Sequence, residues 1–114
     1  MCQSSPQMER KLLTLFYKAS NYPAMREKLQ YLRAQGWKIQ ITHADRGFCR
    51  ISDKLITIPC WVFMHSDREY DVYYLAHEMA HTIPDPEIHG DIWLTEFIRL
   101  CPIRIRKFEI GYRL

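Results

Sequence analysis

Nineteen residues, LAHEMAHTIPDPEIHGDIW from Leu75 to Trp93, constrain this chain more than any other part of it. His77 and His81 are four positions apart, and Pro84 and Pro86 follow soon after them. Residues four apart in an α-helix are separated by about 40° around the axis and roughly 6 Å along it, so both imidazoles share one face. Proline breaks a helix when it falls in the interior. The segment therefore predicts a helix that presents two imidazoles together, followed by a turn.

The apolar residues around the histidine pair also favour a helix. On a helical wheel the apolar side chains lie opposite the histidines: Val72, Leu75, Met79 and Ile83. Ser66 followed by Glu69 is a capping-box pattern, which would start the helix near Asp67. We expect the helix to continue through His81, with its apolar side buried in the core.

Paired imidazoles suit a metal ion, and catalytic zinc usually takes three protein ligands and leaves a fourth position for water. We expect His89 to be the third ligand, because a turn over residues 83–88 would bring the start of the next helix back towards the pair. Gly90 would allow close backbone packing beside it. Glu78 points about 100° further round the helix than His77, beside a metal rather than on it. The pattern predicts one Zn²⁺ per chain, held by His77, His81 and His89.

Three neutral ligands leave the ion's charge uncompensated, which lowers the pKa of bound water from about 15.7 towards roughly 7. Glu78 would accept a proton from this zinc-bound water and pass it to the departing amine while hydroxide attacks a polarised peptide carbonyl. The expected activity is that of a zinc metallopeptidase acting on a protein or peptide. Cobalt, manganese or iron could occupy the same ligands.

Five further residues near the motif are candidates for supporting roles. Tyr70 and Tyr74 lie on the histidine face, where they could contact substrate or pack beside the cleft. Asp85, Glu87 and Asp91 flank His89 and could accept the free N–H of a metal-bound imidazole. For Asp91, capping of the last helix is an equal alternative.

The remaining histidines and the cysteines do not form a second site in the sequence. His43 and His65 stand alone, and a lone histidine is more often at the surface or hydrogen-bonded than a metal ligand. No C-x-x-C pair is present, so we expect mostly buried thiols, which suits a reducing cytoplasm. The cysteines are Cys2, Cys49, Cys60 and Cys101.

The rest of the chain predicts an α+β fold. Helical spacing of apolar residues indicates two N-terminal helices, and short β-branched and aromatic segments separated by turn signals indicate three antiparallel strands. A C-terminal helix starts near His89 or Asp91 and ends at about Leu100, before Pro102. The predicted ranges are 6–20 and 23–35 for the first helices, 37–43, 48–52 and 54–60 for the strands, and 103–114 for an extended tail.

Length and composition set the remaining expectations. A chain of 114 residues with 47% hydrophobic and 25% charged residues suits one domain, residues 1–114, and we expect a monomer. No apolar stretch approaches the roughly 18 residues that span a bilayer, so we expect no membrane contact and a cytoplasmic protein. The net charge of +3 is too small to name a polyanion as partner. A basic concentration near the end leaves open either weak DNA contact or a solvated strand edge, through Arg99, Arg104, Arg106, Lys107 and Arg113.

HEMAH, then a loop, then HGDIW resembles the SprT-like zinc metallopeptidases, which include the Spartan proteases and are related to the WLM-domain peptidases. The resemblance implies a small zincin-like domain in which His77, His81 and His89 bind zinc and Glu78 is the catalytic base. Gly90 and Trp93 complete the pattern, and substrates would include DNA-associated proteins. The paired cysteines of the zinc ribbon that many relatives append are missing from this sequence.

One reading from another class remains open. The chain could be a binding module that keeps zinc for stability and recognises protein or nucleic acid without turnover. The intact Glu78 favours the enzyme, because a purely structural site has no need of a base there.

Overall fold

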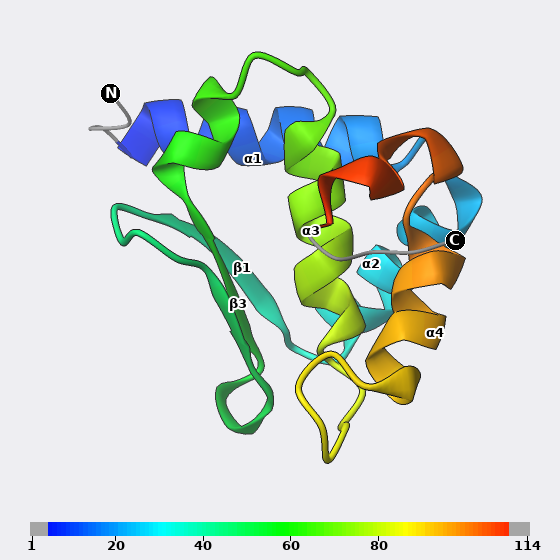
Figure 1. Cartoon of the computed structure of the whole chain (residues 1–114). Helices are drawn as coiled ribbons and strands as arrows, with labels where there is room; N and C mark the ends of the chain where they lie inside the picture. Colours follow the sequence, from blue (N-terminus) through cyan, green and yellow to red (C-terminus); the bar gives the residue numbers. More distant parts are fainter. Residues whose placement is uncertain (1–4, 110–114) are drawn as a thin grey trace.

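The computed structural model describes residues 5–109 and combines helices with a small sheet (Figure 1). The α+β class predicted from the sequence is confirmed. In chain order the elements, with η marking a 3₁₀ helix, are α1 (Ser5–Ala19), α2 (Pro23–Ala34), β1 (Lys38–Thr42), β2 (Phe48–Arg50), η1 (Ile51–Asp53), β3 (Leu55–Pro59), η2 (Cys60–Met64), α3 (Tyr70–Ala80), α4 (Asp91–Leu100) and η3 (Ile103–Phe108). The helices predicted before the sheet and after the proline turn agree with α1, α2 and α4 to within about a residue.

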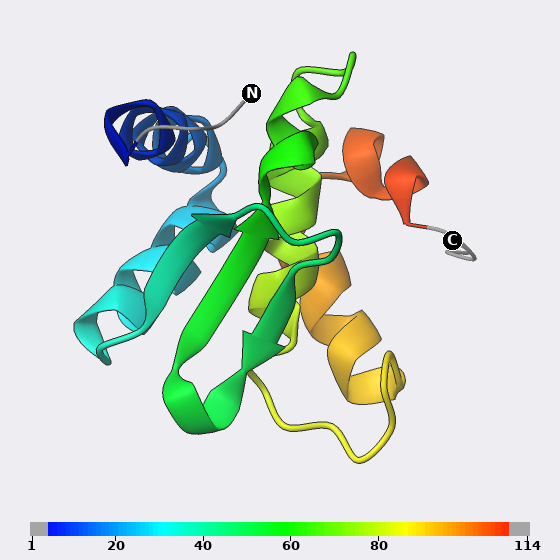
Figure 2. The same ribbon diagram turned by 90° about the vertical axis from the view of Figure 1, so that its left-hand side faces the viewer.

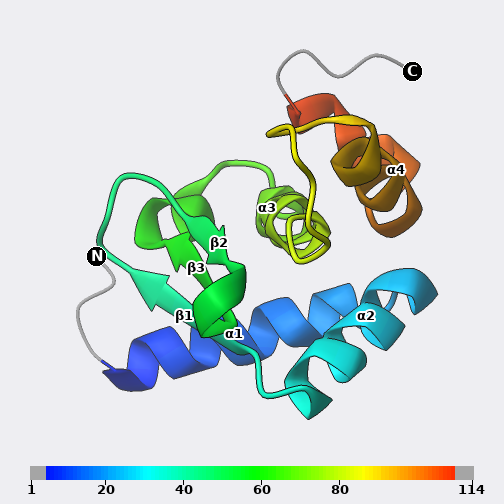
Figure 3. The same ribbon diagram turned by 90° about the horizontal axis from the view of Figure 1, so that it is seen from below.

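The helix α3 lies at the centre of the described residues. Figures 1 and 3 show the sheet on one side of α3 and α4 on the other, with α1 and α2 along a third side. Its predicted apolar side is fully buried at Val72, Leu75 and Met79, whereas Ile83 lies past the helix end and is 36% exposed. Burial of each aliphatic side chain stabilises the fold by roughly 1.5–3 kcal/mol. These contacts anchor the apolar side of α3 in the core, so the two histidines lie on a helix that is held firmly in place.

The sheet is mixed, so the prediction of three antiparallel strands was wrong. Figure 2 shows β3 between β1 and β2. Strand β1 runs parallel to β3, with Ile39 opposite Ile56, and β2 runs antiparallel to β3. The loop after β1 passes the end of β3 rather than forming a hairpin, and therefore β2 pairs with the far edge of β3. Successive strands are neighbours in most sheets; β2 and β3 follow that tendency, and β1 and β2 do not.

Gly47 is the residue that makes this crossing feasible. A Cβ atom at this position would lie 2.3 Å from the carbonyl oxygen of Thr57 and 2.9 Å from the ring of Tyr74. The backbone N–H of Gly47 donates to the Tyr74 hydroxyl at 2.9 Å. The crossing loop is thereby tied directly to α3.

The helix α3 begins three residues later than the capping-box pattern predicted. The Glu69 carboxylate does not fold back onto the backbone, because it accepts hydrogen bonds from Tyr22 at 2.5 Å and from Arg104. Instead, the Asp67 carboxylate accepts the backbone N–H of Glu69 at 2.9 Å, which holds the preceding residues in a turn. The first helical residue is Tyr70.

The described part of the tail is a 3₁₀ helix, η3, rather than the extended segment that we expected; residues 110–114 lie outside the described range. Ile105 is buried against the core at 2% exposure. The Arg106 guanidinium donates to the carbonyl oxygens of Cys101 at 2.9 Å and Ile98 at 2.6 Å. These bonds fold the chain back beneath the end of α4, and an extended strand would break them.

Two further expectations concern membranes and cysteines. Among residues 5–109, none of the helices has the length and apolar character needed to cross a bilayer. Cys49 and Cys101 are free thiols, as expected. Cys60 is disulfide-bonded, so the expectation of a thiol was wrong there, and Cys2 lies outside the described residues.

Candidate metal centre

The two motif histidines lie at the C-terminal end of α3. His77 is in the last turn of the helix, and His81 is its C-cap residue, still with right-handed helical backbone angles. Their ring centroids are 5.1 Å apart. The i, i+4 spacing thus places both imidazoles on one face, as the sequence predicted, although the helix itself ends one residue earlier, at Ala80.

His89 returns to this pair from the far side of the proline turn. Its Nε2 lies 3.1 Å from His81 Nε2 and 3.2 Å from His77 Nε2. Ligands placed tetrahedrally around zinc at about 2.0–2.1 Å are about 3.3 Å from one another. The three side chains therefore form a group that could hold one metal ion, as the sequence predicted.

The hydrogen-bonding capacity of the three rings also fits a cation. An ionised carboxylate only accepts, so the 2.5 Å contact with Glu109 places a ring hydrogen of His77 on Nδ1, and in the neutral ring Nε2 is then an acceptor. His89 Nε2 carries at most one hydrogen and cannot donate fully to both neighbours. A metal ion satisfies all three Nε2 lone pairs at once, which no assignment of hydrogens to three neutral rings achieves.

Burial and mutual proximity favour the neutral forms of His81 and His89. Desolvation, followed by the nearby His77 and His89, lowers the pKa of His81 to about 4. Desolvation and His77 also lower the pKa of His89. Metal coordination requires the neutral imidazole, so these two rings are in the required form at neutral pH.

The backbone that presents His89 is unusual. His89 has φ of 58°, in the left-handed region that few non-glycine residues adopt. Such conformations persist only where surrounding contacts impose them, and they gather at functional sites. Gly90 has an extended backbone, and a Cβ there would lie 2.9 Å from Glu87 Cβ and 3.0 Å from an oxygen of Asp85. The close packing expected of Gly90 is therefore present, against the turn that precedes it.

Asp85 organises this turn. Its Oδ1 accepts the N–H of Glu87 at 2.9 Å, and its Oδ2 accepts the N–H of Trp93, in the first turn of α4, at 2.9 Å. These backbone hydrogen bonds lower the pKa of Asp85. We expected Asp85 to accept a hydrogen from a metal-bound imidazole; its observed hydrogen bonds instead run to backbone amides that shape the His89 loop.

The other acidic candidates, Glu87 and Asp91, are both exposed, Glu87 in the turn and Asp91 in the first turn of α4. The N-cap position is occupied by Gly90, so Asp91 is not the cap that we kept as an alternative. The Asp85 carboxylate caps the helix from outside it.

Trp93 forms the floor of the histidine cluster. Its indole N–H donates to the carbonyl oxygen of His77 at 3.1 Å. The indole ring stacks on His81 with centroids 5.5 Å apart, meets His89 edge to face at 4.6 Å, and stacks on Phe97 at 5.0 Å. A single buried side chain thus contacts all three imidazoles and ties α4 to α3.

Glu78 lies beside the cluster and is only 5% exposed. Burial raises the pKa of Glu78 to about 7; the neighbouring His77 opposes this shift, and the charge of Glu109 adds to it. A carboxyl group that titrates near neutrality can both accept and release a proton at physiological pH. Glu78 is not among the side chains that converge into the possible metal-binding group.

Glu109 is a member of the site that the sequence did not reveal. Its Oε1 lies 2.5 Å from His77 Nδ1 and accepts the Tyr73 hydroxyl at 2.9 Å. Burial raises the pKa of this carboxyl, but the hydrogen bonds from His77 and Tyr73 and the charge of His77 outweigh burial, and the net pKa is lowered. Thirty-two positions separate Glu109 from His77, and no local spacing links the two.

The two tyrosines that we considered for substrate contact belong to an aromatic cluster next to the histidines. The Tyr74 ring is 6.4 Å from the His77 ring, and its hydroxyl accepts the Gly47 N–H. Tyr70 stacks on His65 with centroids 4.0 Å apart and nearly parallel planes. Both tyrosines are only partly buried. His65 stacks here rather than joining the metal group, as expected.

Most of the arginines and lysines at the end of the chain have partners within it. Arg99 pairs with Glu96, Arg104 pairs with Glu69, and Arg106 donates to backbone carbonyls. Lys107 lies over the Phe108 ring, and Arg113 is outside the described residues. These contacts give the basic residues partners within the fold, while the Arg99 and Arg104 side chains remain 51% and 61% exposed.

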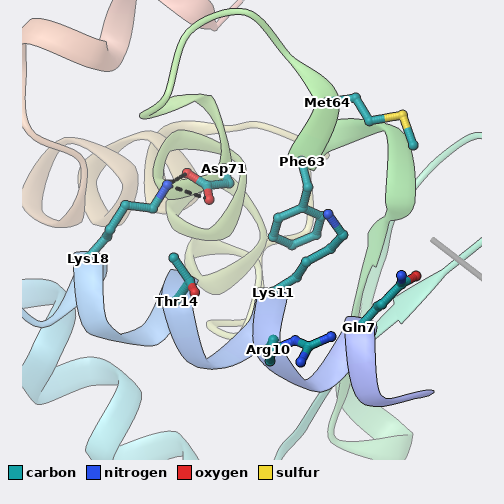
Figure 4. A pocket seen from close by; sticks show the side chains of 8 residues that line it. All are labelled: Gln7, Arg10, Lys11, Thr14, Lys18, Phe63, Met64 and Asp71. Carbon is teal, nitrogen blue, oxygen red and sulfur yellow. Dashed lines mark hydrogen bonds and ion pairs between the residues drawn. The ribbon is translucent and has the colours of Figure 1, made fainter. Parts of the chain in front are cut away.

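A separate cavity of about 620 Å³ lies between α1 and the segment around η2. Figure 4 shows Lys18 paired with Asp71 at one end of it, and Lys11 extended toward the ring of Phe63. Its lining includes none of the residues of the histidine cluster. The candidate metal centre is therefore a distinct site on the molecule.

Comparisons with family models, curated proteins and solved structures gave no match for this chain. The functional argument therefore rests on the site itself.

Proposed function

We propose that this protein is a zinc-dependent metallopeptidase of the SprT-like kind. The observation that supports this most is the convergence of three imidazole Nε2 atoms from two separate segments beside a buried glutamate. Three histidine ligands with an open fourth position suit zinc better than calcium or magnesium, which prefer oxygen ligands.

The chain's own residues can be assigned roles in peptide hydrolysis. His77, His81 and His89 would hold the ion, and bound zinc would supply an acidified water and a Lewis acid for the peptide carbonyl. Glu78 accepts a proton and returns it to the leaving amine. Trp93 packs against the three imidazole rings and holds their orientation. Burial of Glu78 sets its pKa close to the working pH, which favours proton transfer in both directions.

The binding module without turnover is the second candidate. The module would also need the three histidines. A buried carboxylate beside them would then destabilise the fold without serving a function, because burying an ionisable group opposes folding. Engagement of Arg99, Arg104 and Arg106 within the fold gives no support to a phosphate-binding tail.

The experiment that tests the proposal compares wild type, Glu78→Gln and the exposed-loop control Glu87→Gln in a casein cleavage assay with one equivalent of zinc. We expect Glu78→Gln to retain zinc stoichiometry and melting temperature and to lose about 10²–10⁴-fold in rate, while Glu87→Gln cleaves normally. Chelation should stop the wild type and zinc should restore it. Cleavage by Glu78→Gln at the wild-type rate would refute the mechanism, and a wild type that binds zinc but cleaves nothing would support the binding module.

A further inference from the structure

The carboxylate of Glu109 lies behind the metal site, on the opposite side of the His77 ring from its Nε2. Its Oε1 is 2.5 Å from His77 Nδ1, and the side chains of His77 and Glu109 are 17% and 14% exposed. The same oxygen accepts the Tyr73 hydroxyl at 2.9 Å. Glu109 is therefore oriented by a second donor from α3, one helical turn before His77.

The segment that carries Glu109 is fixed by several contacts to the rest of the fold. Ile105 is buried, and Arg106 bonds to two carbonyl oxygens at the end of α4. The Phe108 ring packs edge to face on Tyr70 at 5.1 Å and lies 5.7 Å from Tyr73. Glu109 thus follows immediately after a docked 3₁₀ helix, and its approach to His77 is part of how η3 packs on α3.

From this geometry we infer that Glu109 is the positioning residue of the metal centre and that docking of the C-terminal segment Ile103–Glu109 is coupled to metal binding. A carboxylate that accepts the Nδ1 hydrogen of a ligating histidine fixes its tautomer, orients the ring and makes Nε2 more basic. The inference rests on the metal site of the proposed function and does not require that the protein cleave peptides.

The coupling must act in both directions. If the docked segment raises the affinity for metal, then metal must stabilise the docked segment by the same factor. Within this segment, Arg104 and Arg106 hold the chain in place, so that Glu109 reaches His77.

The test measures zinc affinity by competition with a chromophoric chelator for the full chain, Glu109→Gln, Tyr73→Phe and the control Glu87→Gln. Loss of a carboxylate partner typically costs 10–100-fold in metal affinity, and we expect this loss for Glu109→Gln. Tyr73→Phe, which removes only the hydroxyl, should show a smaller loss. Glu87→Gln, which removes an exposed carboxylate two residues before His89, should bind as wild type.

Two further readouts need no activity, and the first of them needs no metal. Nitrogen-15 NMR of the metal-free protein should show His77 with its hydrogen on Nδ1 in the wild type and a mixture of tautomers in Glu109→Gln. Zinc should also slow amide exchange at residues 103–109 in the wild type, and less so in Glu109→Gln. Should Glu109→Gln fail to fold, Glu109→Asp, which keeps the charge on a shorter side chain, takes its place.

Wild-type zinc affinity together with an unchanged His77 tautomer in the Glu109 variant would overturn the inference. Reduced affinity in that variant alongside a wild type that cleaves no substrate would sustain the inference and reject the peptidase. Normal cleavage by the wild type, with no effect of Glu109→Gln on zinc affinity or on the His77 tautomer, would support the peptidase and reject the inference about Glu109.

Discussion

His89 Nε2 lies 3.1 Å from His81 Nε2 although eight positions and two prolines separate the residues along the chain. The approach depends on a left-handed backbone at His89 and on the Asp85 carboxylate, which joins the turn to the start of α4. The candidate metal centre is thus built by the loop as much as by the helix, and its integrity can be tested through residues outside the three histidines.

The first prediction concerns the loop. Asp85→Ala should lower zinc affinity while leaving its stoichiometry at one, because the backbone amides of Glu87 and Trp93 lose their acceptor and His89 is no longer held in place. Isothermal titration with zinc measures this. Glu87→Ala in the same loop is the control and should bind normally. Wild-type affinity in Asp85→Ala would show that the loop keeps its shape without this carboxylate.

The second prediction concerns the crossing between β1 and β2. Gly47→Ala places a methyl group against the backbone oxygen of Thr57 and should destabilise the protein by about 3 kcal/mol, since such overpacking is relieved only by moving backbone. Gly36→Ala meets no atom within 4 Å but keeps a φ of +91°, and should cost roughly 1–2 kcal/mol. Urea unfolding gives both values, and equal losses would contradict the close approach at Gly47.

The third prediction is a pH dependence of stability at a buried network away from the metal. The Glu96 carboxylate accepts from Lys28 at 2.8 Å and from Arg99 at 2.7 and 2.9 Å. The Arg99 hydrogen bond, opposed in part by desolvation and reinforced by Lys28, lowers the pKa of Glu96 from 4.5 to about 2. A lowered carboxyl pKa contributes stability above pH 4.5 that is lost as pH falls through 2.

Glu96→Gln should therefore be less stable than wild type by on the order of 2–3 kcal/mol at pH 7, a figure reduced for the solvent exposure of Arg99. The difference should shrink as pH falls below 4.5. Urea titrations at a series of pH values test this, with the exposed Glu9→Gln as the control. A loss that stays constant with pH would indicate a packing effect instead.

The fourth prediction concerns the floor of the site. Trp93→Phe keeps an aromatic ring against Phe97 but removes the N–H bond to the His77 carbonyl, and should cost about 1–2 kcal/mol. The matched change Trp61→Phe also removes an indole hydrogen bond, to Asp45, but at a side chain that is 42% exposed. We expect a loss of about 0.5 kcal/mol or less there, because water replaces the partner. Thermal unfolding measures the loss of stability in each variant. Equal losses would contradict the structural role of Trp93.

The parts of the structure that follow from local spacing were predictable. The four-residue interval between His77 and His81, the apolar side of α3 and the proline break each act over one or two helical turns, and each appears in the fold. Predicting the position of His89 also required a reversal of the chain, which the two prolines indicated.

The parts that depend on distant residues were not predictable. Glu69 could have completed a capping box, but Tyr22 and Arg104 compete for its carboxylate. The order of the strands depends on a loop that Gly47 allows to pass β3, and strand patterns carry no information about it. Glu109 reaches His77 only because η3 folds back on α3.

The most direct measurement of the central claim is anomalous X-ray scattering at the zinc edge from crystals grown with one equivalent of zinc. We predict one strong peak per chain at about 2.0–2.1 Å from the Nε2 atoms of His77, His81 and His89, with Glu78 beside it and not bonded to it. A peak that excludes His89, or that lies away from all three rings, would contradict the account.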